Sequence, residues 1–208
     1  MAIKVAVNRA LTAITALPTA AALTDGNLTL LTTATASSSA TLDFTSNIDS
    51  TYDSYLFKFI NCHPASDNVT FQVGFRDGST AYDATKTTTF FRAYQYEDNS
   101  GAALAYVAGQ DLAQSTNFQS LTEGTGGDND QSCSGTLHLF NPSSTTFVKH
   151  FIATVNNAHA VNLSENVYVA GYCNVTAAID AVQFKFSSGN IDSGTIKMYG
   201  VGDKQSWL

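Results

Sequence analysis

The sequence predicts an all-β protein, specifically a jelly-roll-type antiparallel β-sandwich that follows a short N-terminal arm or helix. The first observation is composition: hydrophobic residues make up 44% of the 208 residues, whereas charged residues make up only 13%, about half of the usual share. The second is residue choice, because 26 Thr, 13 Phe and 9 Tyr favour half-buried strands over helical bundles. The third is the alternation of apolar and polar residues after Gly26, without a helical period.

The first predicted strands flank a Ser-rich stretch. We expect short strands at residues 27–33 and 39–45, with the sequence ATASSS as the turn between them. The next segment, 54–62 (SYLFKFINC), carries large apolar residues at both odd and even positions. This pattern predicts a strand that is buried on both faces.

The rest of the chain continues as strand, turn, strand. Residues 68–75 alternate cleanly, and the sequence NPSST joins two strands as a hairpin. The side chains expected to point into the core include Val69, Phe71, Val73, Val182, Phe184 and Phe186. The further predicted strands are 86–97, 135–140, 146–155, 166–175, 181–188 and 194–201.

About ten strands without a convincing helix predict one β-sandwich or barrel over residues 25–208. The long linkers between some strands favour Greek-key or jelly-roll connections over a simple meander. No internal repeat is present, which argues against propellers and solenoids.

Residues 1–24 differ from the remainder and are predicted to form a separate arm. Apolar residues at spacings of four and three mark one narrow helical stripe, and Pro18 ends it. The stripe consists of Ile3, Val7, Leu11, Ile14 and Leu17. It is too short to be stable alone, so it is either an anchoring segment that docks on a partner surface or a frayed terminus.

The charge balance narrows the range of partners. The formal net charge is −7 and the sequence pI is about 4.8, which is unfavourable for neutralising nucleic-acid phosphates or an anionic membrane. No apolar run is long enough for a transmembrane helix. Trp207 is expected at a subunit interface, since interfaces are enriched in tryptophan.

No catalytic or phosphate-binding motif is found, so we expect neither enzymatic activity nor a required cofactor. His138 and His150 flank the predicted hairpin, but no carboxylate near in sequence completes a metal site. Asp128 and Asp130 have the Asp-x-Asp spacing of calcium loops without the downstream Gly and Glu, which leaves calcium binding at Gly126–Asp130 open. The three cysteines, Cys62, Cys133 and Cys173, lie in or beside apolar runs and are expected to be free core thiols of a chain made in a reducing compartment.

Four stretches of residues 36–201 carry a family resemblance. They begin FTSNIDSTYDSYLFKFINC, TTTFFRAYQYEDNSGA, DNDQSCSGTLHLFNPSS and AAIDAVQFKFSSGNIDSG. These stretches resemble uncharacterised virion structural proteins of marine tailed bacteriophages. The resemblance implies a structural role in the virion and supplies no catalytic residues.

Two functions follow as expectations. The first is a non-enzymatic decoration, cement or spike protein on the capsid surface, assembled after synthesis in the host cytoplasm. The alternative is a tail-fibre or baseplate module that binds a host surface glycan or protein. The expected partners are other copies of the chain in a homotrimer, together with the major capsid protein or tail proteins.

Overall fold

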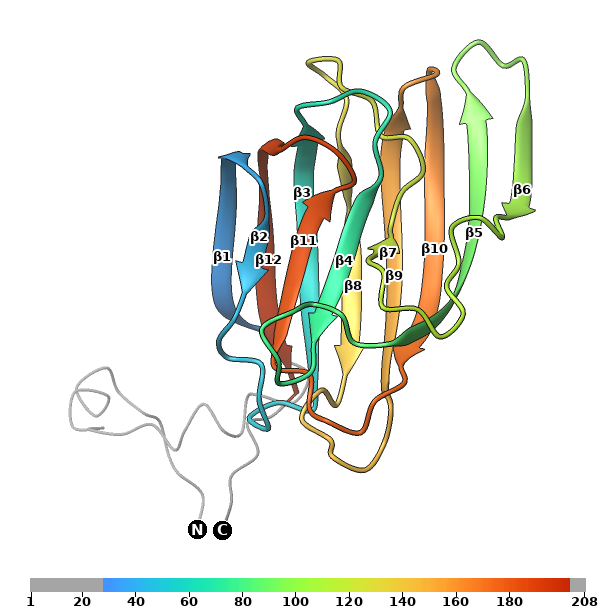
Figure 1. Cartoon of the computed structure of the whole chain (residues 1–208). Coiled ribbons are helices and arrows are strands. Elements are labelled where there is room, and N and C mark those ends of the chain that lie inside the picture. Colours follow the sequence, from blue (N-terminus) through green and yellow to red (C-terminus); the bar gives the residue numbers. More distant parts are fainter. Residues whose placement is uncertain (1–27, 203–208) are drawn as a thin grey trace, which may run out of the picture.

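The computed structural model describes residues 28–202, which form twelve strands and contain no helix (Figure 1). The strands lie in two antiparallel sheets packed face to face, so the predicted all-β sandwich is confirmed. One sheet has eight strands in the order β1-β12-β3-β8-β9-β10-β5-β6, and the other has four in the order β2-β11-β4-β7. The strands are β1 Leu28–Ser39, β2 Leu42–Phe44, β3 Ser54–Pro64, β4 Phe71–Arg76, β5 Lys86–Tyr96, β6 Ala102–Tyr106, β7 Gln119–Ser120, β8 Cys133–Phe140, β9 Lys149–His159, β10 Leu163–Cys173, β11 Ala181–Phe186 and β12 Ile191–Val201.

The N-terminal part of the sandwich differs from the sequence-based prediction. β1 is one long strand that runs through the ATASSS stretch, because these small residues pair in register with β12 (Thr35 with Thr195, Ala36 with Gly194). The predicted turn at this place is therefore wrong: pairing with a distant strand outweighs the local turn preference. β6 and β7 were not predicted at all, and both are short.

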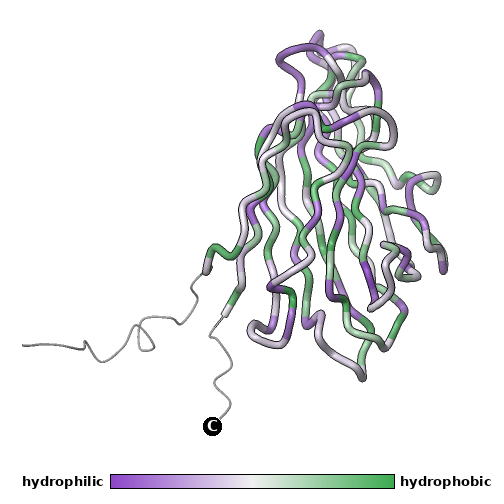
Figure 2. The backbone as a smooth tube through the Cα atoms, turned by 60° about the vertical axis from the view of Figure 1, so that its left-hand side comes forward, coloured by the Kyte–Doolittle hydropathy of each residue, from purple (hydrophilic) through white to green (hydrophobic). Residues whose placement is uncertain are grey.

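Alternating side chains build the core between the sheets. Figure 2 shows hydrophobic and hydrophilic residues alternating along many of the strands. The six residues expected to point inward are all buried. Phe184 of β11 lies at the centre of an aromatic cluster, with ring centroids 5.1 Å from Phe59 and 5.5 Å from Phe57. Apolar packing thus holds the four-stranded sheet on the larger one.

The eight-stranded sheet is wider than its partner. In Figure 1 the four-stranded sheet lies over β1, β12, β3, β8 and β9, whereas β10, β5 and β6 extend beyond it. The segment after β6 covers part of this extension and pairs with the edge of β5: the Thr88 amide donates to the Leu112 carbonyl oxygen at 2.9 Å, and Lys86 and Ser115 bond reciprocally. Among residues 28–202, no second layer covers the far side of the large sheet.

That uncovered side corrects the prediction for β3. Tyr55, Phe57 and Phe59 are buried between the sheets, but Lys58 and Ile60 are exposed, and Ile60 retains 41% of its accessible surface. The prediction of burial on both faces is therefore wrong for the described part of the chain, residues 28–202, in which one sheet packs against β3.

Candidate interaction surface

The uncovered side of the eight-stranded sheet, here called the outer face, collects most of the exposed apolar residues. Ten large hydrophobic side chains are exposed within residues 28–202. The strand registers place eight of them on the outer face: Leu28, Leu30, Ile60, Phe91, Leu104, Tyr106, Ile152 and Tyr168. The other two lie in turns, since Phe147 joins β8 to β9 and Val161 joins β9 to β10.

Two rows of paired residues cross the outer face, because directly opposed residues of antiparallel strands share a side of the sheet. The Ile152 row runs through Leu30, Tyr199, Leu56, His138, Ile152, Ala170 and Thr89. The Phe91 row runs through Thr33, Lys197, Lys58, Thr136, Thr154, Tyr168, Phe91 and Tyr106. The rows bring together residues that are up to about 170 positions apart in the sequence.

Aromatic side chains dominate the end of the outer face over β10, β5 and β6. Phe91 and Tyr168 stack with centroids 4.9 Å apart and ring planes 11° apart, and Tyr106 is the next partner in the row. The Asn166 amide donates to the Tyr168 hydroxyl at 2.7 Å and holds the phenol ring in place. Such a stack presents a flat apolar surface with a polar rim.

Beside this stack lies a shallow, mostly apolar hollow of about 450 Å³. The residues that line it include Thr87, Thr89, His150, Ile152, Gly171 and Tyr172. A Cβ at Gly171 would lie 2.6 Å from the Thr87 carbonyl oxygen, so glycine is what lets β5 and β10 approach each other there.

The charge of the outer face differs from that of the whole chain. Neither row contains an aspartate or glutamate, although the sequence has 17 acidic residues and a net charge of −7. The only ammonium groups in the rows are Lys58 and Lys197, which oppose each other directly. Neither forms a salt bridge with another described residue, and like charges in this position disfavour the pair.

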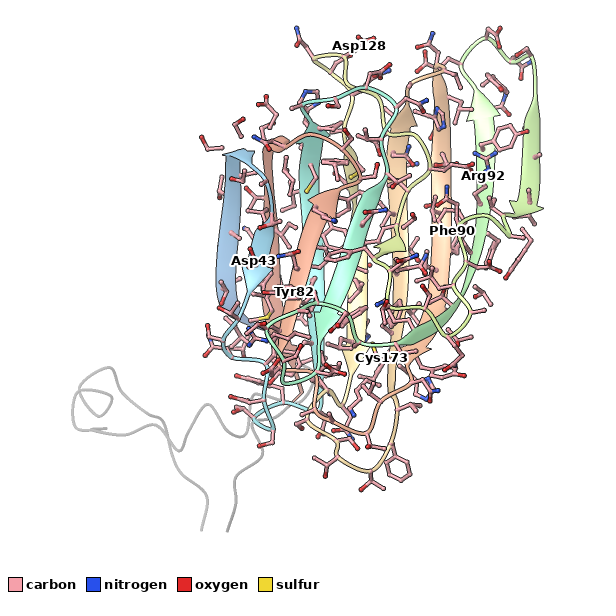
Figure 3. The ribbon with its side chains drawn as sticks, in the orientation of Figure 1. Asp43, Tyr82, Phe90, Arg92, Asp128 and Cys173 are labelled. Atoms are coloured by element: carbon pink, nitrogen blue, oxygen red, sulfur yellow. The ribbon has the colours of Figure 1, made fainter. Side chains whose placement is uncertain are left out.

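The opposite side of the sandwich, the outward surface of the four-stranded sheet, is polar and internally paired. Arg76 forms a salt bridge with Asp180 at 2.8 Å, and the Gln183 amide donates to Asp43. Burial, together with the nearby Asp43 carboxylate, raises the pKa of Tyr82 to about 12 (Figure 3). A second hollow of about 450 Å³ lies at this surface, and among the side chains that line it are Gln72, Gln110, Asp111, Asn117, Phe118 and Lys185.

Within residues 28–202, no three His, Cys, Asp or Glu side chains gather to hold a metal ion. His138 shares a hydrogen bond with the Ser54 hydroxyl at 2.9 Å, and burial lowers its pKa. The His150 ring contacts Tyr172 instead, with centroids 5.9 Å apart. At Gly126–Asp130, where calcium binding was left open, Gln131 bonds back to Asp128, whose loop lies at the tip labelled in Figure 3.

The three cysteines are free and buried, as predicted. The sequence-predicted attachment residues fall outside the part of the chain that the structure describes: the stripe at Ile3, Val7, Leu11, Ile14 and Leu17, and Trp207 near the other end. The outer face itself was missed. Its one local signal was the apolar pattern on both faces of residues 54–62, which indicated a second buried face.

Comparisons with protein-family models, curated proteins and solved structures found no match for this chain. Among residues 28–202, no helix is long and apolar enough to cross a lipid bilayer.

Proposed function

We propose that this protein is a non-enzymatic structural subunit of a tailed-phage virion, a decoration, cement or spike protein on the capsid surface, and that it assembles as a homotrimer through its outer face. The observation that carries the proposal is the concentration of eight exposed apolar side chains on one face whose two rows contain no carboxylate. A large apolar patch on a water-soluble chain marks a surface that another protein covers.

The order of the strands supports a capsid role. Leaving out β5, β6, β9 and β10, the remaining eight strands, numbered along the chain, pair in the orders 1-8-3-6 and 2-7-4-5. We therefore infer a jelly roll with four added strands, an architecture that recurs in viral capsids and in lectins. The four extra strands extend the 1-8-3-6 sheet and carry the aromatic end of the outer face.

The charges of the outer face favour a ring over a two-fold dimer. In a two-fold contact centred on this face, Lys58 and Lys197 of each copy would meet the carboxylate-free rows of the other. A second copy turned so that an acidic surface meets the outer face satisfies both lysines, since the chain carries a net charge of −7. A head-to-tail contact of this kind gives a closed assembly only when the copies form a ring. The smallest ring that is larger than a dimer contains three copies.

The test is the mass of the full chain in solution, measured by light scattering at micromolar concentration. We expect three times 22.1 kDa for the wild type. Ile152→Glu, which adds a charge at the centre of the face, should give monomers with an unchanged strand spectrum. Phe147→Glu, in the exposed turn that joins β8 to β9 and outside both rows, is the matched control and should remain trimeric. A wild-type protein that stays at 22.1 kDa contradicts the proposed assembly.

The place on the particle is tested separately. Quantitative mass spectrometry of purified virions counts copies, and hundreds per particle are expected for a shell decoration. A few to a few dozen copies would instead indicate the tail.

The tail alternative has one observation in its favour. The hollow on the four-stranded sheet combines amide and carboxylate side chains with the Phe118 ring, over which the Lys185 ammonium lies at 4.3 Å. Amides, charges and an aromatic face are the groups with which proteins bind sugars. Specific retention on host-cell glycans that Lys185→Ala abolishes would support this second function.

A further inference from the structure

Two of the three buried cysteines face each other across neighbouring strands. Cys62 of β3 and Cys133 of β8 are direct partners in the antiparallel ladder, and both are fully buried on the inner side of the sheet. Directly opposed residues of such a pair have Cα atoms about 4.5–5.5 Å apart, which lies within the range that a disulfide spans. The backbone thus already holds the two residues at a distance compatible with a covalent bond.

The two thiols also influence each other: burial, followed by the hydrogen-bonding and charge interaction with Cys62, raises the pKa of Cys133 well above its usual value. The third cysteine, Cys173, is the last residue of β10 and is labelled in Figure 3. Its partners on the neighbouring strands are Lys86 of β5 and Lys149 of β9. It therefore serves as a buried cysteine without a partner thiol.

A second observation points to the same position. Asn157 of β9 is the direct strand partner of Cys133 and is 1% exposed. Within residues 28–202, neither its side-chain nitrogen nor its side-chain oxygen has a hydrogen-bond partner. A buried amide without partners is costly. Beside Cys133, its N–H groups offer hydrogen bonds to a sulfur that carries negative charge.

We propose that Cys62 and Cys133 form an intramolecular disulfide once the protein meets an oxidising environment, and that this bond locks β3 to β8. The bond is independent of the proposed virion role, because it concerns two residues of one chain. It goes beyond the free thiols of the structure, which correspond to the reduced state.

The chemistry balances with a low-molecular-weight disulfide as oxidant. One cysteine loses its proton and attacks oxidised glutathione, which forms a mixed disulfide and releases one glutathione thiolate. The second cysteine, as a thiolate, then attacks the protein sulfur and displaces the other glutathione. Two S–H bonds are lost, one S–S bond forms, and oxidised glutathione is reduced to two thiols.

Burial of the two thiols limits the rate of this reaction, and the cross-link between β3 and β8 determines its effect on thermal stability. Since both thiols are buried, the reaction needs a local opening of the sheet and should proceed over hours rather than seconds. The bond closes a loop of about 70 residues that contains β4 to β7. Removing that freedom from the unfolded chain should raise the thermal midpoint by about 5–10 °C.

The test uses the full chain, reduced and then incubated with oxidised glutathione at pH 8, with and without 2 M urea. After acid quench and denaturation, remaining thiols are alkylated and the intact mass is measured. We expect a loss of 2 Da, one alkylated cysteine, and a tryptic cross-link between residues 59–76 and 93–149. The cross-linked protein should melt higher than the reduced protein, and reductant should reverse the shift.

Three variants make the result specific. Cys173→Ala should form the cross-link like the wild type, whereas Cys62→Ala and Cys133→Ala should form none and melt equally with and without oxidant. Three alkylatable thiols after incubation in urea would overturn the proposal. So would stable glutathione adducts on Cys62 or Cys133 without a cross-link, or a cross-link that includes Cys173.

Discussion

The interior of the sandwich has two halves that are stabilised in different ways. Beneath β2, β11 and β4, six phenylalanines pack against one another: Phe44, Phe57, Phe59, Phe71, Phe184 and Phe186. Beneath the segment that covers β10 and β5, buried polar groups alternate with apolar ones. The aromatic half depends on shape and buried area, whereas the polar half depends on the direction of each hydrogen bond.

Gln119 is the centre of the hydrogen bonds in the polar half. Its side-chain oxygen accepts from the Thr88 hydroxyl at 2.5 Å, and its nitrogen donates to the carbonyl oxygens of Gln110 at 2.9 Å and Ser120 at 2.8 Å. Thr88 in turn accepts from the Leu112 amide at 2.8 Å. One side chain of β7 therefore fixes the covering segment to β5.

A buried carboxylate completes the polar half. Glu165 of β10 has no exposed surface, and Arg92 of β5 donates to it at 2.7 Å, while Arg92 also lies 2.6 Å from Glu123. The backbone amide of Glu123 donates to the second oxygen of Glu165 at 3.1 Å. Phe91, whose ring belongs to the aromatic stack, lies between Phe90 and Arg92 in β5, the two residues labelled in Figure 3. Because the ion pair fixes Arg92, it also positions the stack that is proposed for assembly.

The largest effect is expected in the aromatic half. Phe184→Ala should destabilise the protein by about 3–5 kcal/mol, because the ring contacts four others and its loss leaves a cavity between the sheets. Urea unfolding measures the change. Phe147→Ala is the control, since this side chain is 69% exposed in a turn and should cost less than about 0.5 kcal/mol. Similar values for the two variants would show that the Phe184 ring contributes no more to stability than an exposed ring.

The next effect tests the buried ion pair. Glu165→Gln should destabilise the protein by about 2–3 kcal/mol, because it removes one of the two carboxylates that balance the charge of the partly buried Arg92. The Glu123 carboxylate remains beside Arg92. The matched control is Asp180→Asn in the exposed Arg76 pair, which should change stability by less than about 1 kcal/mol. If the assembly proposal holds, Glu165→Gln should also weaken trimers, whereas Asp180→Asn should not. A cost equal to that of the control would mean that Glu165 contributes no more than a surface pair.

The sequence predicted the aromatic half much better than the polar half. Clean alternation around Phe71 and Phe184 identified the inward faces, since period-two patterns are local and strong. Nothing local marked Lys86 or Glu165 as buried, because a charged residue is buried only where distant strands supply its partners.

The outer face and the thiol pair share that difficulty. Ile152 becomes the neighbour of His138 and Ala170 only after the registers of three strands are known. The partnership of Cys62 with Cys133 also depends on the irregular pairing that follows Phe59. Composition and alternation predict which elements form, whereas register decides which side chains meet.

A smaller effect is expected at Gln119. Gln119→Ala should cost about 1–2 kcal/mol, since it leaves the Thr88 hydroxyl and two carbonyl groups without their partner. Hydrogen exchange should quicken at the amides of Leu112 and Ser115, which bond to β5, while amides of β4 and β11 keep their protection. Uniform acceleration over both sheets would show that the polar half is not a separate unit.

The smallest expected effect is a dependence of stability on pH, which arises from two histidines on the two sides of the large sheet. Burial lowers the pKa of His159, which accepts a hydrogen bond from the Val161 amide at 3.2 Å, and also that of His138 on β8. Both therefore bind protons less readily in the folded state than in the unfolded chain, where the pKa is about 6.5. Between 6.5 and the lowered folded values, the unfolded state holds more protons, so stability must fall as the pH drops below about 6.5. Each site contributes at most about 1.4 kcal/mol per pH unit.

Urea unfolding at pH 7.5, 6.5 and 5.5 measures the slope of stability against pH. His159→Gln and His138→Gln should each reduce it, and the double variant should reduce it further, because the sites lie on different sides of the sheet and act independently. A wild-type stability that rises between pH 6.5 and 5.5 would contradict the sign of both shifts.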